Sequence, residues 1–299
     1  MSFAQQRLWL LDRIEPGSVA YNVPSVIRIR GALDVRVLEA ALSKVFNRHE
    51  GLRAIFAEDE QGPFQKILRV RDWKLPLTNI DDDGLTRQDV ELKRLAAIEL
   101  MTPFNLAQGP LFRARLFRLN DREHVFAVVI HHIVTDGWSM NLLIRDLATA
   151  YVQMSAHGDV YFESSTLQYA DFAAWQRARL TDAVLQNMLG YWKTTLANVP
   201  ALNLPTDFKR PPVQTYNGAS ARFTIPAQAR VQLSALAQAE NASLFMGLLS
   251  AFAVVLQRYS GQNDFCIGTP VAGRDRSELE NMVGFFVNTQ VLDNALHGR

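Results

Sequence analysis

One continuous run, residues 125–154, joins a buried strand to a long helix through a short polar segment. Residues 125–130 are apolar and mostly β-branched, which is typical of a buried strand. Apolar residues then recur at helical spacing from Leu142 to Met154. The nine residues between, 131–139, hold two imidazoles, a carboxylate, a glycine and a hydroxyl. Because an unpaired neutral polar group costs roughly 2–7 kcal/mol when buried, we expect these groups to be hydrogen bonded or functional.

The two histidines of the polar segment are adjacent, which limits what they can do together. Neighbouring residues of a strand point to opposite faces, so His131 and His132 cannot both serve one small site if the strand continues through them. A helical metal site needs histidines four residues apart, which argues against a cage of His131, His132 and Asp136. We predict no metal site. Structural burial of both histidines and a catalytic base both remain open from the residues alone.

Length and composition narrow the class of protein. A chain of 299 residues exceeds the usual size of one hydrophobic core and favours two lobes. A formal net charge of +1 gives no basic surface for nucleic acid, and apolar runs such as residues 251–256 are too short to cross a bilayer. Polar residues precede any apolar run at the start, so we expect no secretory signal. A single cysteine, Cys266, fits a reducing compartment, and we predict a cytoplasmic protein with neither nucleic-acid nor membrane partners.

Helical and strand-like patterns alternate along the chain, which indicates a mixed sheet in an α/β or α+β fold. The expected helices cover residues 2–11, 34–48, 85–101, 139–156, 167–196, 226–240 and 243–259. The expected strands cover residues 23–30, 54–56, 64–70, 111–119, 125–132, 219–225, 264–269 and 285–292. Residues 81–84, three aspartates and a glycine, are predicted to form a solvated turn and helix cap, with calcium binding as the alternative. The Pro-rich residues 202–212 are the best candidate for a crossing between lobes.

Five segments, in this order, resemble motifs of the condensation domains of nonribosomal peptide synthetases. They are residues 2–10, 48–56, 131–139, 169–176 and 283–290, and the third carries the HHxxxDGWS pattern. Ala54 stands where threonine is commoner in the second motif. A bare HxxxD is a weak signal, whereas five motifs in order are specific. Two later motifs of the family, a His-Gln pair and an Arg/Asn-Pro segment, do not occur, so we expect a C-terminally truncated domain.

The resemblance implies an α/β (α+β) fold with two chloramphenicol-acetyltransferase-like lobes in a V. The N-terminal lobe, residues 1–165, is expected to be complete. Residues 166–299 are expected to hold a connector and a partial C-terminal lobe. The missing part would include the strand that reaches across to the first lobe and much of the tunnel floor.

The resemblance also implies the reaction, which is peptide-bond formation between a donor acyl or peptidyl thioester and an acceptor aminoacyl thioester. Both substrates are tethered to the phosphopantetheine of upstream and downstream peptidyl carrier domains, an adenylation domain is adjacent, and no cofactor binds directly. An α-amino group has a pKa of about 7.7–8.0, so a fair fraction is already nucleophilic near neutral pH. Orientation of the reactants can contribute roughly 7–11 kcal/mol, so one mild base suffices.

The resemblance assigns that base to His132, with Asp136 and Gly137 completing the catalytic segment. A following helix N-terminus would favour the neutral imidazole. His131 is expected to pack and hydrogen bond. Asp136 is expected to act as a structural ion pair or loop brace rather than as a second base, with Arg53 or Arg274 as its partner. Gly137 allows either close approach of a substrate or a tight turn.

Three further residues complete the expected site. Trp138 is expected in the core or in a tunnel wall, Ser139 as the N-cap of the following helix, and Asn288 in contact with substrate. Residues 2–10 resemble the subtype that joins an L-configured donor to an L-configured acceptor.

Other functions stay open beside this one. A non-catalytic platform that docks carrier or tailoring proteins, or an inactive fragment, would keep the fold without the chemistry. A coenzyme A-dependent acyltransferase of the same superfamily would share HxxxD but not the other four motifs. Heterocyclisation relatives carry aspartates at the His-His pair, so His131 and His132 argue against that subtype.

Overall fold

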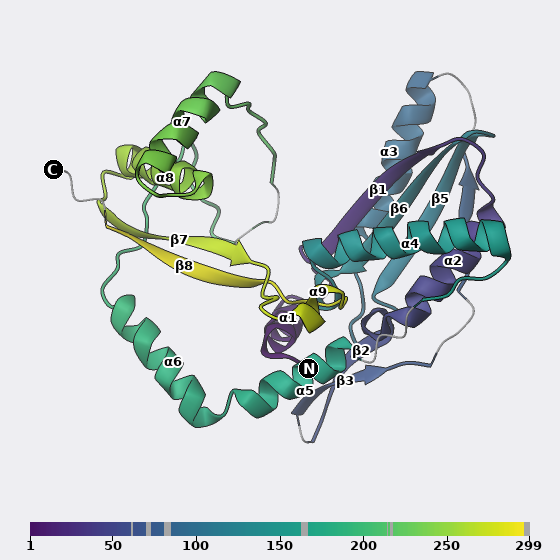
Figure 1. The fold of residues 1–299 in the computed structure, drawn as a ribbon, viewed down its shortest axis with the longest axis horizontal. Coiled ribbons are helices and arrows are strands. Elements are labelled where there is room, and N and C mark those ends of the chain that lie inside the picture. Colours follow the sequence, from purple (N-terminus) through teal and green to yellow (C-terminus); the bar gives the residue numbers. More distant parts are fainter. Residues whose placement is uncertain are drawn as a thin grey trace. The chain divides into compact units, whose positions relative to one another are not determined.

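The computed structural model describes residues 1–60, 62–69, 73–80, 85–162, 167–213, 215 and 218–295 (Figure 1). The acidic turn predicted at residues 81–84 lies outside the described residues. The chain forms two compact units: Met1–Ala183 with Ala272–Asn288, and Val184–Val271 with Thr289–Arg299. The lobe boundary expected after residue 165 stays a prediction.

A four-stranded mixed sheet is the frame of the first unit, with strand order β1-β6-β5-β4. The strands are β1 (Asn22–Arg30), β4 (Leu77–Asn79), β5 (Phe112–Asn120) and β6 (Glu123–His131). β6 is antiparallel to β1 and β5, and β4 runs parallel to β5. Every residue of β6 after Glu123 is buried, because the strand is central and is covered on both faces. The buried strand predicted before the polar segment is therefore confirmed.

Helices cover both faces of this sheet (Figure 1). α2 (Val35–Arg48) and α4 (Gly137–His157) pack with the side chains of Phe126, Val128 and Ile130, which alternate along β6. Alternation turns Val125 and Ala127 to the other face, where they pack with Leu92 of α3 (Leu85–Met101). The site segment, which follows β6 directly, therefore starts from a strand fixed on both sides.

The sequence predicts several helix ends correctly. α1 (Phe3–Ile14) begins with a capping box in which Ser2 and Gln5 bond each other's backbone N–H groups. Asp34 caps α2, and Ser243 caps α8 (Leu244–Ser260). Gly158, in the left-handed conformation with φ of 78°, ends α4 at the predicted place.

A β-hairpin, two short helical turns and one further helix complete the first unit. The strands predicted at residues 54–56 and 64–70 are β2 (Ala54–Asp59) and β3 (Gly62–Ile67), which form an antiparallel hairpin. The 3-10 turn η1 (Glu50–Arg53) precedes the hairpin, and α9 (Ser277–Glu280) is a single short turn. The single helical segment predicted over residues 167–196 is wrong. It is two helices, α5 (Tyr169–Arg179) and α6 (Asp182–Thr195), because Thr181 and Asp182 favour a new helix start. All of α6 after Ala183 belongs to the second unit.

The second unit contains α7 (Ala227–Ala239), α8 and an antiparallel pair of β7 (Asp264–Val271) and β8 (Asn288–Ala295). The strand predicted at residues 219–225 is wrong: these residues are exposed and irregular, and alternation alone does not make a strand without a partner to pair with. Within the described residues no single helix is long and apolar enough to cross a membrane. Among the described helices, only α7 and α8 taken together, bent by 107° at their junction, reach the length and composition of a span.

Candidate active site

The polar segment lies where β6 ends and α4 begins. β6 stops at His131, and residues His132–Val134 form a single 3-10 turn, η2, before α4 starts at Gly137. The strand predicted to continue through His132 therefore ends one residue earlier. His131 is buried as the last strand residue, and His132 is half-buried on the turn. The two imidazoles are thus separated by a change of backbone conformation at His132.

The imidazole of His131 is enclosed by packing. Its side chain is 3% exposed, its Nδ1 accepts the N–H of Ile133 at 3.1 Å, and its ring lies near those of Tyr21 and Phe104. Burial, with a smaller contribution from the neighbouring His132, lowers the pKa of His131 from 6.5 to about 4. A neutral, packed ring fits the structural role expected for this residue.

Because the pKa of His131 is lowered in the folded protein, we expect the free energy of unfolding to fall in mild acid. Its folded-state pKa lies below its unfolded value, so the unfolded chain binds the extra proton between pH 6.5 and about 4. The contribution of His131 is complete above pH 6.5, and we expect roughly 3 kcal/mol to be lost as the pH falls to about 4. Urea unfolding at a series of pH values measures this, with His131→Asn as the matched variant. Asparagine keeps an acceptor for the Ile133 N–H but does not titrate, so equal pH slopes in the two proteins would contradict the assignment.

The imidazole of His132 has a defined tautomer. Its Nδ1 lies 2.6 Å from the carbonyl oxygen of Thr135. A carbonyl can only accept, so Nδ1 carries the proton of the neutral ring and the lone pair is on Nε2. The ring also packs edge-on against Phe285, with centroids 4.8 Å apart and planes at 63°. This is the orientation that a base acting through Nε2 requires.

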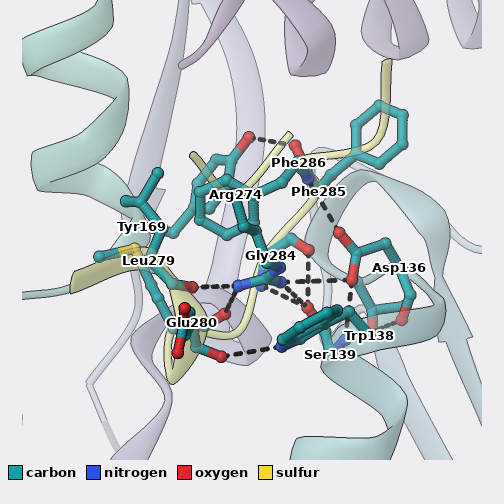
Figure 2. A network of polar contacts seen from close by, with 12 residues as sticks. Asp136, Trp138, Ser139, Tyr169, Arg274, Leu279, Glu280, Gly284, Phe285 and Phe286 are labelled. Atoms are coloured by element: carbon teal, nitrogen blue, oxygen red, sulfur yellow. Dashed lines mark hydrogen bonds and ion pairs between the residues drawn. The ribbon is translucent and has the colours of Figure 1, made fainter. Parts of the chain in front are cut away.

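The carboxylate of Asp136 is a fully buried acceptor at the start of α4 (Figure 2). Its Oδ1 accepts the N–H of Ser139 at 2.8 Å and a guanidinium N–H of Arg274 at 3.3 Å, and its Oδ2 accepts the N–H of Phe286 at 3.1 Å. Asp136 is therefore the N-cap of α4, and the expected cap at Ser139 is wrong. Aspartate and serine cap equally well, so residue type could not choose between them.

The guanidinium of Arg274 completes the ion pair. Its side chain is 1% exposed, and it also donates to the carbonyls of Leu279 and Met282, the latter at 2.6 Å. Burial lowers the pKa of Arg274, and the Asp136 carboxylate opposes that shift. Arg274 thereby links the carbonyls of Leu279 and Met282 to the start of α4. The backbone of Gly284 and Phe286 bonds Ser139 and Asp136 directly (Figure 2).

Arg53, the other partner considered for Asp136, is engaged elsewhere. It donates to the carbonyl oxygens of Leu68 at 2.7 Å and Asn47 at 3.3 Å. The structure therefore pairs Asp136 with Arg274, 138 residues away in the sequence.

The hydroxyl of Ser139 is saturated by its neighbours. It donates to the carbonyl of Gly284 at 2.9 Å and accepts the N–H of Gly284 at 3.1 Å and an N–H of Arg274 at 2.8 Å. One donor and two acceptor positions are all that a hydroxyl has. A side chain at Gly284 has no room, because its Cβ would lie 1.8 Å from the Tyr169 ring.

We expect Ser139→Ala to lower the free energy of unfolding by about 2 kcal/mol, because the buried Gly284 and Arg274 groups lose their partner. Chemical denaturation measures the loss. Ser155→Ala, at an exposed position of the same helix, is the control and should change stability little. Equal effects of the two changes would contradict the network.

The remaining predicted residues lie at the surface of the first unit or at its end. Gly137 is exposed at the first position of α4, outside the left-handed region, and a Cβ there would meet no atom within 4 Å. Trp138 is 46% exposed, with its indole N–H donating to the Glu280 carbonyl at 2.8 Å, so it does not lie in the core. Its place in a tunnel wall stays a prediction. Asn288 is exposed at the start of β8, and its contact with substrate stays a prediction. Among the described residues, no group of three or more His, Cys, Asp or Glu side chains could hold a metal ion.

Sequence reasoning gave no role to several residues that shape the site. Tyr169, buried, donates to the carbonyl of Phe285 at 2.5 Å, and its pKa is raised mainly by burial. Phe285 and Phe286 were seen only as part of an expected strand, yet both are buried in an irregular segment of the first unit. The signal that could have identified these residues was their place in the motifs, with Tyr169 in the fourth and both phenylalanines in the fifth.

Comparison with known proteins gives the same family throughout. The family model described as "Condensation domain" matches residues 1–297. The chain is 44% identical over 299 residues to a linear gramicidin synthase of Brevibacillus parabrevis, covering 100% of this chain and 4% of the relative. It is 43% identical over 300 residues to malpibaldin synthetase of Mortierella alpina, covering 100% of this chain and 5% of the relative. The chain thus spans a small part of the relatives that it matches.

Solved structures agree with the sequence relatives. The chain superposes on the X-domain in its complex with OxyB from teicoplanin biosynthesis with a TM-score of 0.88 at 30% identity, covering 100% of this chain and 65% of that one. The four-domain nonribosomal peptide synthetase holo-AB3403, bound to AMP and glycine, gives 0.84 at 28% identity, with coverages of 99% and 22%. The predicted mixed α/β, chloramphenicol-acetyltransferase-like fold is confirmed.

Proposed function

Because the chain belongs to the condensation-domain family of nonribosomal peptide synthetases, we propose that it forms the peptide bond between a donor acyl or peptidyl thioester and an acceptor aminoacyl thioester. The observation that carries this proposal is the orientation of His132. Its Nδ1 is bonded to the Thr135 carbonyl, which leaves Nε2 as the basic atom.

Attack of an amine on a thioester requires only one mild base from the protein. The amine nitrogen attacks the thioester carbonyl, a C–N bond forms, the C–S bond breaks, and the thiolate leaves. His132 Nε2 takes the proton that the nitrogen sheds, which can then pass to the departing sulfur. Gly137, exposed at the start of α4, would let a substrate approach the backbone closely. Asp136 acts through the backbone that it holds, because its oxygens are occupied by Arg274 and backbone N–H groups.

The partners follow from the reaction. The substrates would be carried on phosphopantetheine arms of an upstream and a downstream peptidyl carrier domain, beside an adenylation domain, and the chain itself would bind no cofactor. The names of the relatives as synthetases and the likeness to a four-domain synthetase support this arrangement. The form of residues 2–10 supports an L-configured donor and acceptor, and the single cysteine supports a cytoplasmic setting.

A docking platform is the second candidate, and one observation favours it. The X-domain, with which the chain shares a TM-score of 0.88, was solved in complex with OxyB, so a protein of this fold can bind another protein. The test presents the domain with two carrier domains loaded with aminoacyl-phosphopantetheine and follows dipeptidyl thioester by mass spectrometry. Product supports condensation, and no product with retained carrier binding supports the platform. Product from free coenzyme A thioesters alone would identify an acyltransferase instead.

A further inference from the structure

The first turn of α1 holds two polar side chains that are almost fully buried. Ser2 is 0% exposed and Gln5 is 1% exposed, although serine and glutamine belong mostly to surfaces. The amide of Gln5 accepts the N–H of Ser2 at 3.0 Å and donates to the carbonyl of Ile133 at 3.1 Å. Ile133 is the residue after His132, in the middle of η2. Gln5 is therefore tied directly to the turn that carries the proposed base.

Ser2 starts a second connection, whose direction is fixed by chemistry. The carbonyl of Phe285 can only accept a hydrogen bond, so the Tyr169 hydroxyl must donate its single proton to that oxygen. The Ser2 hydroxyl, 2.9 Å from the Tyr169 oxygen, must then donate to it, and it accepts the N–H of Gln5 at 3.1 Å. The result is a one-way chain of three hydrogen bonds from α1 to Phe285. Such chains strengthen one another in a buried setting.

Both connections end beside the same imidazole. One holds the carbonyl of Ile133, next to His132 in the chain, and the other holds the carbonyl of Phe285, whose ring packs on His132 with centroids 4.8 Å apart. Phe285 lies in no helix or strand, so no ladder of backbone bonds fixes it, and η2 is only a single turn. Hydrogen bonds from side chains must therefore hold the backbone of Phe285 and of η2 in place.

We propose that the first turn of α1 is a positioning element for His132: Gln5 fixes the turn that carries the imidazole, and Ser2, through Tyr169, fixes the aromatic ring against which the imidazole packs. The inference rests on the proposed function only in that His132 is taken as the base. Burying polar groups is costly unless their bonds are made, and apolar residues of the same shape could fill these sites without that cost. Here the bonds reach the two backbone carbonyls that border the imidazole.

The test combines the tautomer of His132 with the rate of condensation. Gln5→Met and Tyr169→Phe each remove one donor at nearly constant volume. In the wild type, 15N NMR of labelled histidine should show His132 protonated on Nδ1. In the two variants we expect mixed tautomers, and single-turnover dipeptide formation at saturating carriers lower by about 10- to 100-fold, because small misplacements are costly to catalysis. Binding of loaded carriers should stay within about twofold, since neither buried change alters the surface.

Matched control residues are present on α1 and α4. Gln6→Met changes a glutamine of the same turn that contacts Arg177 at the surface, and Tyr151→Phe removes a hydroxyl that accepts the N–H of Asp34. Both should keep the wild-type spectrum and rate. An unchanged His132 spectrum in Gln5→Met and Tyr169→Phe, or an equal change in the controls, overturns the proposal.

A substitute variant and a measurement that does not depend on activity keep the proposal testable. Should Tyr169→Phe fail to fold, as judged by circular dichroism, Ser2→Ala breaks the same chain while leaving the aromatic core intact, and its spectrum decides. Should the wild type form no dipeptide, the proposed function fails, but the NMR comparison still tests whether α1 sets the tautomer of His132.

Discussion

Replacing His132 by alanine should reduce dipeptide formation by about 10²- to 10⁴-fold, the usual contribution of a well-placed general base. The reason is local: the ring is held by the Thr135 carbonyl and by Phe285, with its basic Nε2 as the remaining polar atom. The residual rate would come from the orientation of two tethered substrates, which the variant retains. Single-turnover formation of dipeptidyl thioester on loaded carriers measures the loss.

Two matched variants separate the base from its surroundings. His132→Asn keeps a donor for the Thr135 carbonyl but has no Nε2, so it should be nearly as slow as His132→Ala. His157→Ala, in the exposed last turn of α4, should be as fast as the wild type. Product formed at the wild-type rate by His132→Asn would show that the side chain only holds the turn, and would remove the base from the mechanism.

The largest effect on stability is expected from breaking the ion pair between Asp136 and Arg274. We expect Asp136→Ala or Arg274→Ala to lower the free energy of unfolding by about 3–5 kcal/mol, because each leaves the opposite charge buried without its partner. Their side chains are 0% and 1% exposed, so water cannot replace the missing group. Urea unfolding followed by circular dichroism measures both single variants.

The double variant tests whether the two charges act as a pair. Asp136→Ala combined with Arg274→Ala removes both buried charges, and we expect the double variant to be less destabilised than the sum of the two single changes. Lys74→Ala removes a charge 3.3 Å from Glu39 at the surface and is the control, since exposed ion pairs contribute little. Strict additivity in the double variant would show that the two side chains act separately.

Local patterns predicted the elements around the site better than the contacts within it. The apolar run before His131, the helical spacing after Leu142 and the glycine at 158 placed β6 and α4 correctly, because each depends on residues close in sequence. The partner of Asp136 depends on packing between distant segments, and Arg53 and Arg274 carry the same charge. Only three-dimensional structure could choose between them.

Other failures have the same origin. Residues 285–287 have the composition of a strand, but Tyr169 and Asp136 bind the backbone of Phe285 and Phe286, so β8 starts only at Asn288. Trp138 is large and apolar, yet the first turn of α4 turns it outward to the Glu280 carbonyl. In both cases tertiary hydrogen bonds override a correct reading of side-chain character.

The return of Ala272–Asn288 to the first unit has a consequence for hybrid synthetases. A crossover point anywhere between residues 184 and 271 would join the start of α4 from one parent to the returning segment from another. Three contacts would then join residues from different parents, and each would have to be compatible. They are the hydrogen bond of Ser139 to Gly284, the close packing of Gly284 on Tyr169 and the ion pair of Asp136 with Arg274. Chimeras that exchange residues 272–288 together with the first unit should therefore fold more often than those cut within that interval.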